Sequence, residues 1–260
     1  MMPDRIRLDG RVAVVTGAAV VIGIATMRLL AERGARIVAV DRRQWDVQAA
    51  IGDLPASAQA LAIAADVTRE DEVAGYVRAA IEKFGTIDVF YNNAGVEGVV
   101  TPITKYPLET FRNVIDVNVI GVFLGLKHVL PVMLKQNRGS IINTASIAGL
   151  IGATEIAAYA ASKHAVIGLT KSAALECTAT AVRVNCVYPG LIDSRMLSAI
   201  VEGRNPGKAP VASEKVVERI PARRLGQASE VASIVAFLAS DEASYVSGSA
   251  YTVDGGRVAG

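Results

Sequence analysis

Three side chains of this sequence could together move a proton. Tyr159 and Lys163 lie four residues apart in a segment of helical period, a spacing that puts the phenol and the ammonium on one helix face. An adjacent cation favours the phenolate, so it lowers a tyrosine pKa from its reference value of about 10 towards working pH. Such a phenol can act in general acid–base catalysis. Ser146 follows a predicted strand shortly before the pair.

A glycine-containing turn near the amino terminus could hold phosphates. Residues Thr16–Gly23 read TGAAVVIG and run from a predicted strand directly into a predicted helix. Backbone N–H groups and the positive helix end would then face a pyrophosphate. The next predicted strand ends at Asp41, whose carboxylate can accept both hydroxyls of an adenosine ribose and repels a 2′-phosphate. Arg42 and Arg43 could receive such a phosphate, but Asp41 stands at the strand end itself and favours NAD.

Short apolar, β-branched runs alternate along the chain with longer segments of helical period. The predicted strands are Val12–Thr16, Arg36–Asp41, Asp88–Asn92, Ser140–Thr144 and Val182–Val187. The predicted helices are Gly23–Arg33, Arg69–Phe84, Leu108–Lys135, Tyr159–Cys177 and Ser229–Ser240. This alternation predicts an α/β fold with a doubly wound parallel sheet of about seven strands and helices on both faces. We expect one domain over residues 1–260.

The segment Gly190–Pro221 departs from this alternation. Glycine, proline and charged residues interrupt a weak helical pattern there. An irregular segment of about thirty residues in a compact domain usually has a function. Because it follows the carboxyl end of a strand, where ligands of such sheets bind, we expect it to contribute to substrate binding.

Composition and charge narrow the classes of partner. Hydrophobic residues make up 52% of the chain and charged residues 20%, and the formal net charge is only +2. Neither nucleic acid nor an anionic membrane is expected as a partner. The run Val12–Ile24 is too short to span a bilayer, and Met1–Gly10 has no apolar segment of a secretory signal. We expect a cytoplasmic protein with no metal site. The cysteines and histidines that lack ligand-spaced partners are Cys177, Cys186, His128 and His164.

Taken together, these motifs resemble the short-chain dehydrogenase/reductase family along essentially the whole chain. In order, the matching positions are Thr16–Gly23, Asp41, Asp66-Val67, Asn92–Gly95, Asn118, Ser146, the Tyr-Ala-Ala-Ser-Lys run Tyr159–Lys163, Asn185, Pro189-Gly190 and Asp254–Gly256. The resemblance implies a Rossmann fold, a nicotinamide dinucleotide cofactor and a homotetramer. Its interfaces would use the helices around Leu108–Lys135 and Tyr159–Cys177 and the region Ser229–Gly256. Val119–Leu134 is apolar almost all round, more than one sheet face needs.

The resemblance also implies roles for individual residues. Tyr159 would exchange the proton, Ser146 would hydrogen-bond the substrate oxygen, and Lys163 would hold the nicotinamide ribose and lower the pKa of Tyr159. Asn118 would position a water of a proton relay. The implied cofactor contacts are Gly17, Val21, Ile22 and Gly23 at the turn, Asp41 with Asn93, Ala94 and Gly95 at the adenosine ribose, Asp66 and Val67 at the adenine, and Pro189, Gly190, Ile192 and Ser194 at the nicotinamide.

One position departs from the family's pattern. The turn of the family carries three glycines, and here the middle one is replaced by Val21. The middle glycine lets the pyrophosphate approach the backbone, and glycine tolerates conformations that a β-branched residue resists. Because Asn118, Ser146, Tyr159 and Lys163 are all present, we expect weaker cofactor binding rather than loss of function.

The expected substrate pocket is lined mainly by small or apolar residues. Its residues are Ser146, Ala148, Ile151, Tyr159 and Met196, with Glu97, Glu155 and Arg195 as polar exceptions. Apolar lining favours a compact, uncharged substrate. The Gly190–Pro221 segment is similar to that of family members that act on cyclic alcohols and ketones.

Three functions are therefore compared. The favoured one is an NAD(H)-dependent secondary alcohol dehydrogenase or ketone reductase. An NADPH-dependent ketoacyl-carrier-protein reductase would want a basic residue beside the pyrophosphate, and Asp41 argues against it. A non-catalytic dinucleotide sensor is suggested only by Val20 and Val21, and the intact Ser146, Tyr159 and Lys163 argue against that.

Overall fold

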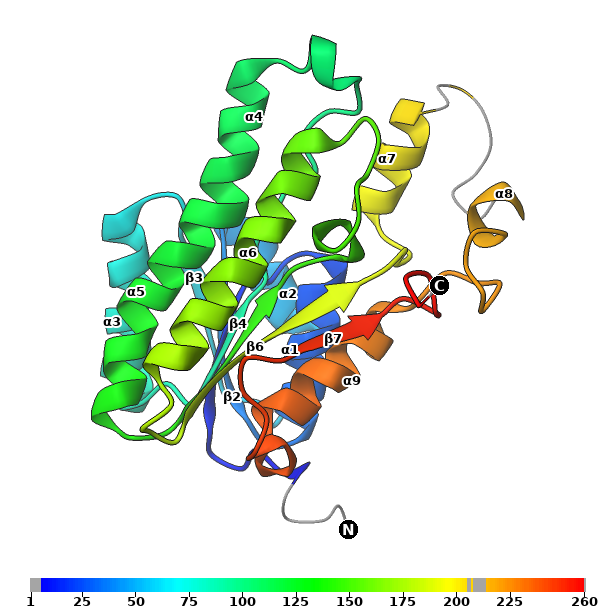
Figure 1. Cartoon of the computed structure of the whole chain (residues 1–260). Coiled ribbons are helices and arrows are strands. Elements are labelled where there is room, and N and C mark those ends of the chain that lie inside the picture. Colours follow the sequence, from blue (N-terminus) through cyan, green and yellow to red (C-terminus); the bar gives the residue numbers. More distant parts are fainter. Residues whose placement is uncertain (1–5, 205–206, 208–213, 260) are drawn as a thin grey trace.

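Seven parallel strands form one sheet that runs through the molecule (Figure 1). The computed structural model describes residues 6–204, 207 and 214–259. The strands are β1 (Val12–Thr16), β2 (Arg36–Asp41), β3 (Ala60–Ala64), β4 (Val89–Asn92), β5 (Gly139–Thr144), β6 (Val182–Pro189) and β7 (Ala250–Val253). Their order is β3-β2-β1-β4-β5-β6-β7. The order reverses between β1 and β4, and the carboxyl ends at such a reversal are where doubly wound sheets bind ligands.

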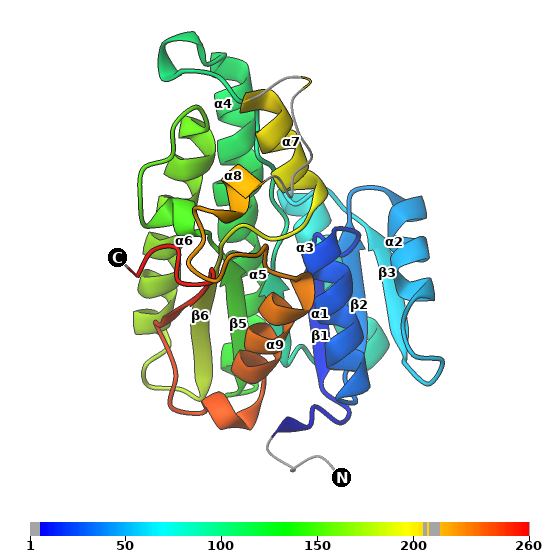
Figure 2. The same cartoon turned by 90° about the vertical axis from the view of Figure 1, so that its right-hand side faces the viewer.

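Helices cover both faces of this sheet. They are α1 (Val21–Glu32), α2 (Gln44–Gly52), α3 (Glu70–Phe84), α4 (Leu108–Ile115), α5 (Gly121–Lys135), α6 (Ala157–Glu176), α7 (Arg195–Arg204), α8 (Glu214–Val217) and α9 (Ala228–Ala239). Buried residues of α1, α2 and α9 pack on one face, as Figure 2 shows for α1 and α9. Those of α3, α5 and α6 pack on the other. The predicted doubly wound arrangement is confirmed.

The structure contains elements that the sequence pattern did not predict. The strands β3 and β7 and the helix α2 are additions, and α7 lies inside the segment that was expected to be irregular. The predicted helix Leu108–Lys135 is divided into α4 and α5 by five residues of π-helix, Asp116–Ile120. A π-helical turn widens a helix by one residue and is often found at functional sites.

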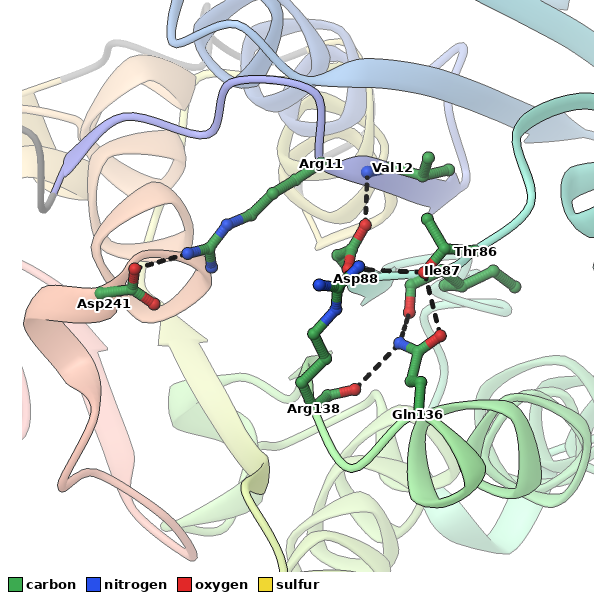
Figure 3. Close-up of polar contacts among 8 residues, drawn as sticks. All are labelled: Arg11, Val12, Thr86, Ile87, Asp88, Gln136, Arg138 and Asp241. Carbon is green, nitrogen blue, oxygen red and sulfur yellow. Dashed lines mark hydrogen bonds and ion pairs between the residues drawn. The ribbon is translucent and has the colours of Figure 1, made fainter.

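The amino ends of the central strands are joined by a buried carboxylate. Asp88 accepts a hydrogen bond from the Val12 N–H at 3.0 Å and forms an ion pair with Arg138 at 2.9 Å (Figure 3). Gln136 donates to the Ile87 carbonyl at 2.6 Å in the same network. These contacts connect β1, β4 and the start of β5 at the end of the sheet opposite the ligand-binding end.

Within the described residues, one helical segment, Leu108–Lys135, is long and apolar enough to cross a membrane by length and composition alone. Its most apolar window has a mean hydropathy of 1.8 and is 44% buried in the fold. Leu126, Val129 and Met133 of α5 lie in the core, whereas Phe123 and Leu134 are exposed. A core helix with an apolar outer face meets the same criteria as a membrane span.

Candidate active site

Two glycines shape the turn between β1 and α1. Gly17 has a φ of 62°, a left-handed conformation that suits glycine, and a Cβ there would lie 2.9 Å from the Cα of Ala94. A Cβ at Gly23 would lie 2.1 Å from the Gly17 carbonyl oxygen. Side chains at either position would push the turn open. The turn thus brings the first N–H groups of α1 to the carboxyl end of the sheet, where they can bind an anion.

Val21 is the first residue of α1 and has a helical backbone, which valine adopts without strain. Val20 before it is extended, with φ −93° and ψ 158°. The two side chains are 46% exposed at Val20 and 42% exposed at Val21. Any weakening of cofactor binding at this position therefore comes from the valine side chain and not from strain in the loop.

We predict that Val21→Gly binds NAD(H) more tightly, with an unchanged ratio of NAD to NADP affinity, because less side chain faces the pyrophosphate. Glycine in the first turn of a helix should also lower the stability of the protein without cofactor, by about 0.5–1 kcal/mol. Cofactor titration and thermal melting of the same variant measure the two effects. Val21→Ala is the matched control, since it removes the branched side chain but keeps a good helix former. Unchanged or weaker binding in both variants would show that the turn has adapted to valine.

Asp41 lies at the end of β2 beside this turn. Its carboxylate accepts hydrogen bonds from the Ala19 N–H at 2.9 Å and the Arg42 N–H at 2.7 Å. These contacts fix a negative charge next to the turn, at the place expected for the adenosine ribose. The same residue also holds the turn against β2.

The next two predicted contacts follow β3. Asp66 accepts hydrogen bonds from the N–H and the hydroxyl of Thr68, at 2.9 and 2.7 Å. Val67 is buried against the start of α5, where a Cβ on Gly121 would lie 2.8 Å from it. Both residues are thus at the carboxyl end of the sheet, next to β2.

The loop after β4 lies directly against the glycine turn. The Asn93 side chain donates to the carbonyls of Thr16 and Gly17, at 3.3 and 3.2 Å, and accepts from the Thr144 hydroxyl at 3.1 Å. The Ala94 N–H donates to the Thr16 hydroxyl at 3.2 Å. These bonds link the cofactor turn to β5, which leads to Ser146.

The structure brings the four predicted catalytic residues together from separate elements. Tyr159 and Lys163 come from α6, and the Lys163 Nζ lies 5.6 Å from the centre of the Tyr159 ring and donates to the Thr144 carbonyl at 2.7 Å. Ser146 follows β5 and faces the Tyr159 phenol. Asn118, in the π-helical segment, holds Val96 by two hydrogen bonds, 2.8 Å from the Val96 N–H and 2.9 Å to its carbonyl. All four side chains are buried.

Burial shifts the pKa of Tyr159 in the direction opposite to the one expected from its spacing to Lys163. The pKa of Tyr159 is raised, first because burial disfavours the phenolate and also because of the negative charge of Glu97, while Ser146 opposes the rise by hydrogen bonding. Burial lowers the pKa of Lys163 to about 8. The adjacent cation therefore does not by itself bring the phenol to neutral pH. A bound, positively charged nicotinamide would add the charge that favours the phenolate.

The predicted nicotinamide contacts follow β6. A Cβ on Gly190 would lie 2.7 Å from the Asp254 Cα, so the chain passes close to the end of β7. Ile192 is buried, and the Ser194 hydroxyl donates to its carbonyl at 3.1 Å and accepts from the Leu197 N–H at 3.2 Å. Ser194 thus shapes the start of α7, beyond the carboxyl ends of the strands (Figure 1).

Apolar side chains surround Tyr159. Ala148 and Met196, both predicted for the pocket, belong to this cluster. Ile151 lies outside it among the described residues and is 41% exposed, because the chain turns towards the surface after the short 3-10 turn that follows Ser146. The sequence analysis missed Val100, Ala153 and Ile156, which complete the cluster. They lie in loops whose sequence gives no periodic signal.

Two ion pairs fasten α7 to the loops that carry Glu97 and Glu155. Arg195, at the start of α7, donates to both carboxylate oxygens of Glu97, at 3.0 and 3.3 Å. Arg204, at its end, lies 3.6 Å from Glu155. The sequence singled out three of these residues but not their pairing, because the partners are far apart in the chain.

The glycine turn, the open helix end and the buried Lys163 fit a nicotinamide dinucleotide, and comparisons with known proteins agree. The family model described as enoyl-(acyl carrier protein) reductase matches residues 17–257. Levodione reductase of Leifsonia aquatica is 39% identical, over 97% of this chain and 96% of that protein. Cyclohexanol dehydrogenase of an Acinetobacter species is also 39% identical, over 96% and 95%. The crystal structure of an NAD+-bound xylitol dehydrogenase superimposes with a TM-score of 0.90 at 35% identity, covering 96% of this chain and 99% of that one.

The fold and the site thus define an oxidoreductase that uses a nicotinamide cofactor to interconvert a secondary alcohol and a ketone. The chain belongs to the short-chain dehydrogenase/reductase family. Within the described residues there is no group of three or more His, Cys, Asp or Glu side chains that could hold a metal ion.

Proposed function

We propose that this protein is an NAD(H)-dependent dehydrogenase of small, mainly apolar secondary alcohols, cyclic alcohols included. The observation that carries the proposal is the buried Ser146, Tyr159 and Lys163 cluster beside a dinucleotide turn that ends next to Asp41. The sizes of the surrounding side chains favour a compact substrate. The relatives named for levodione and cyclohexanol support the same substrate class.

In this proposal, Ser146 donates a hydrogen bond to the substrate oxygen and Tyr159 exchanges the proton with it. The bound nicotinamide supplies the hydride chemistry. Lys163 contacts the nicotinamide ribose and places its charge near the phenol. Asn118 keeps the loop after β4 in place and positions a water molecule of the proton relay to solvent. Within the segment Gly190–Pro221, the helix α7 lies beside the substrate site as part of the same domain.

An initial-rate screen tests this function. Secondary alcohols, cyclic and open-chain, are offered with NAD+ and with NADP+ in parallel, and the corresponding ketones with the reduced cofactors. We expect the highest kcat/KM for an uncharged alcohol with NAD+. Turnover confined to acyl-carrier-protein ketoesters with NADPH would instead support a ketoacyl-carrier-protein reductase, the activity for which a relative from Thermotoga maritima, 38% identical over 97% of this chain, is named.

Cofactor choice gives a separate prediction. Because Asp41 faces the place of a 2′-phosphate in a partly desolvated site, kcat/KM should favour NAD(H) over NADP(H) by at least about tenfold, which corresponds to roughly 1.4 kcal/mol. Asp41→Asn removes the charge, but its side chain can still accept a hydrogen bond from the turn. The variant should therefore keep the fold and bring the ratio of kcat/KM for NAD(H) to kcat/KM for NADP(H) closer to one. A tenfold preference of the unaltered protein for NADP(H) would overturn this prediction.

We also propose a cytoplasmic homotetramer. Its support is the exposed apolar surface of α4 and α5, with Leu108 62% exposed and Phe123 44% exposed, which a subunit interface would cover. Light scattering should give the mass of four chains at micromolar concentration. A stable monomer under those conditions would contradict the assembly without bearing on the chemistry.

A further inference from the structure

One acidic side chain lies close enough to the apolar cluster of Tyr159 for its charge to affect the Tyr159 phenol. Glu97 follows the loop after β4, and only 8% of its surface is exposed. Its neighbour Val96 is held by Asn118 at both its N–H and its carbonyl. Since Asn118 is fully buried, the position of Glu97 is fixed from within the core. Its negative charge helps to raise the pKa of Tyr159.

The partner of Glu97 is the first residue of α7. Arg195 binds the carboxylate through two nitrogens, at 3.0 and 3.3 Å, and its own side chain is 75% exposed. The next residue, Met196, packs on the apolar cluster of Tyr159. The ion pair therefore joins the loop after β4 to the start of α7, beside the apolar cluster of Tyr159.

The ion pair leaves Glu97 with free hydrogen-bond acceptor sites and no donor. Arg195 occupies one acceptor site on each oxygen of Glu97, and a carboxylate oxygen offers about two. The remaining sites can accept a hydrogen bond but cannot donate one. A hydroxyl group of a ligand satisfies them, an apolar group leaves them unpaired, and a carboxylate is repelled.

We propose that Glu97 is a specificity-determining residue that selects uncharged substrates with a second hydroxyl group beyond the reacting carbon, such as diols, and rejects carboxylates. The inference rests on the proposed function, because it concerns the substrate of the same site. Arg195 orients Glu97 and reduces its net charge, so the two residues affect an anionic substrate in opposite directions.

The test compares three alcohols that share a ring: cyclohexanol, 1,4-cyclohexanediol and 4-hydroxycyclohexanecarboxylate, each with NAD+. For the unaltered protein, kcat/KM should be about tenfold higher for the diol than for cyclohexanol and about tenfold lower for the carboxylate. Glu97→Gln should raise the carboxylate-to-cyclohexanol ratio about tenfold, because Arg195 then has no anionic partner, and should lower the diol-to-cyclohexanol ratio.

Arg195→Gln distinguishes an electrostatic effect of Glu97 from a structural effect of the lost ion pair. It breaks the same ion pair but leaves Glu97 charged, so the carboxylate ratio should fall further instead of rising. A purely structural loss of the link to α7 would move both variants in one direction and would overturn the proposal. Glu32→Gln is the matched control, since it breaks an ion pair with Arg28 near the end of α1, away from the site, with a carboxyl side chain that is 43% exposed, and should leave all ratios unchanged.

The outcomes also distinguish this inference from the function on which it rests. Turnover of all three alcohols with ratios near one in the unaltered protein would overturn the role of Glu97 and leave the dehydrogenase intact. The unaltered protein answers this point even where a variant fails to fold. Turnover of none of the three with NAD+ or NADP+ would overturn the proposed function and this inference together.

Discussion

Replacing Tyr159 with phenylalanine should lower kcat by at least about 100-fold, the usual size of a lost general acid–base step. The ring remains in its cluster with Ala148 and Met196, so the pocket keeps its shape. The hydroxyl that faces Ser146, which we propose exchanges the proton, is lost. Affinity for NAD(H) should hardly change. Steady-state rates with the best alcohol from the screen, together with a fluorescence titration of NADH, measure both effects.

Tyr76→Phe is a suitable control for this substitution. Tyr76 is a buried tyrosine of α3 on the same face of the sheet but packs against Phe90 in the core, away from the catalytic cluster. Its loss of a hydroxyl should leave kcat unchanged within about twofold. Near-normal turnover of Tyr159→Phe would show that another group moves the proton.

Lys163→Ala should damage both catalysis and cofactor binding. The Lys163 Nζ donates to the Thr144 carbonyl and lies beside the Tyr159 ring. In the proposed mechanism, this one side chain acts on both the phenol and the nicotinamide ribose. We expect kcat to fall by about 100-fold or more and the Kd for NAD(H) to rise by about tenfold. Initial rates and cofactor titration give the two values. Loss of turnover with unchanged cofactor affinity would limit Lys163 to a role at the phenol.

The matched control for this variant is Lys171→Ala, on an exposed position of the same helix. It removes a lysine two turns further along α6 without touching the pocket. Both kinetic constants should remain at their original values. A similar loss in both variants would indicate damage to α6 itself.

The central part of the fold could be predicted because its strands are buried on both faces. The strands β1, β2, β4, β5 and β6 consist mostly of apolar residues, and each stands out from the helices between them. The strand β3 is only partly buried and rich in alanine, and β7 is a four-residue edge strand with alternating exposure. Their patterns are too short and too weak to identify without the neighbouring strand.

In the candidate site, too, some features could be predicted from the sequence and others could not. Gly17, Asp41 and the Tyr159–Lys163 spacing are local features, and each can be interpreted from a few neighbouring residues. The pairing of Glu97 with Arg195, by contrast, joins residues that are brought together only when the start of α7 packs on the apolar cluster of Tyr159. The pKa of Tyr159 depends on burial as well, so its direction could not be deduced from helix spacing.

The buried ammonium of Lys163 also has a thermodynamic consequence. An unfolded lysine has a pKa of 10.5 and this one has a pKa of about 8, so the unfolded chain binds the proton more tightly. Below pH 8 the group opposes folding by roughly 3 kcal/mol, and this opposition fades as the pH rises from about 8 to 10.5. Lys163→Ala lacks this titration, so without cofactor the melting temperature of the variant, relative to that of the original protein, should fall as the pH rises from 7 to 10. A difference in melting temperature that stays the same from pH 7 to pH 10 would contradict this. Without cofactor, the positive charge that the proposed chemistry needs therefore opposes folding at neutral pH.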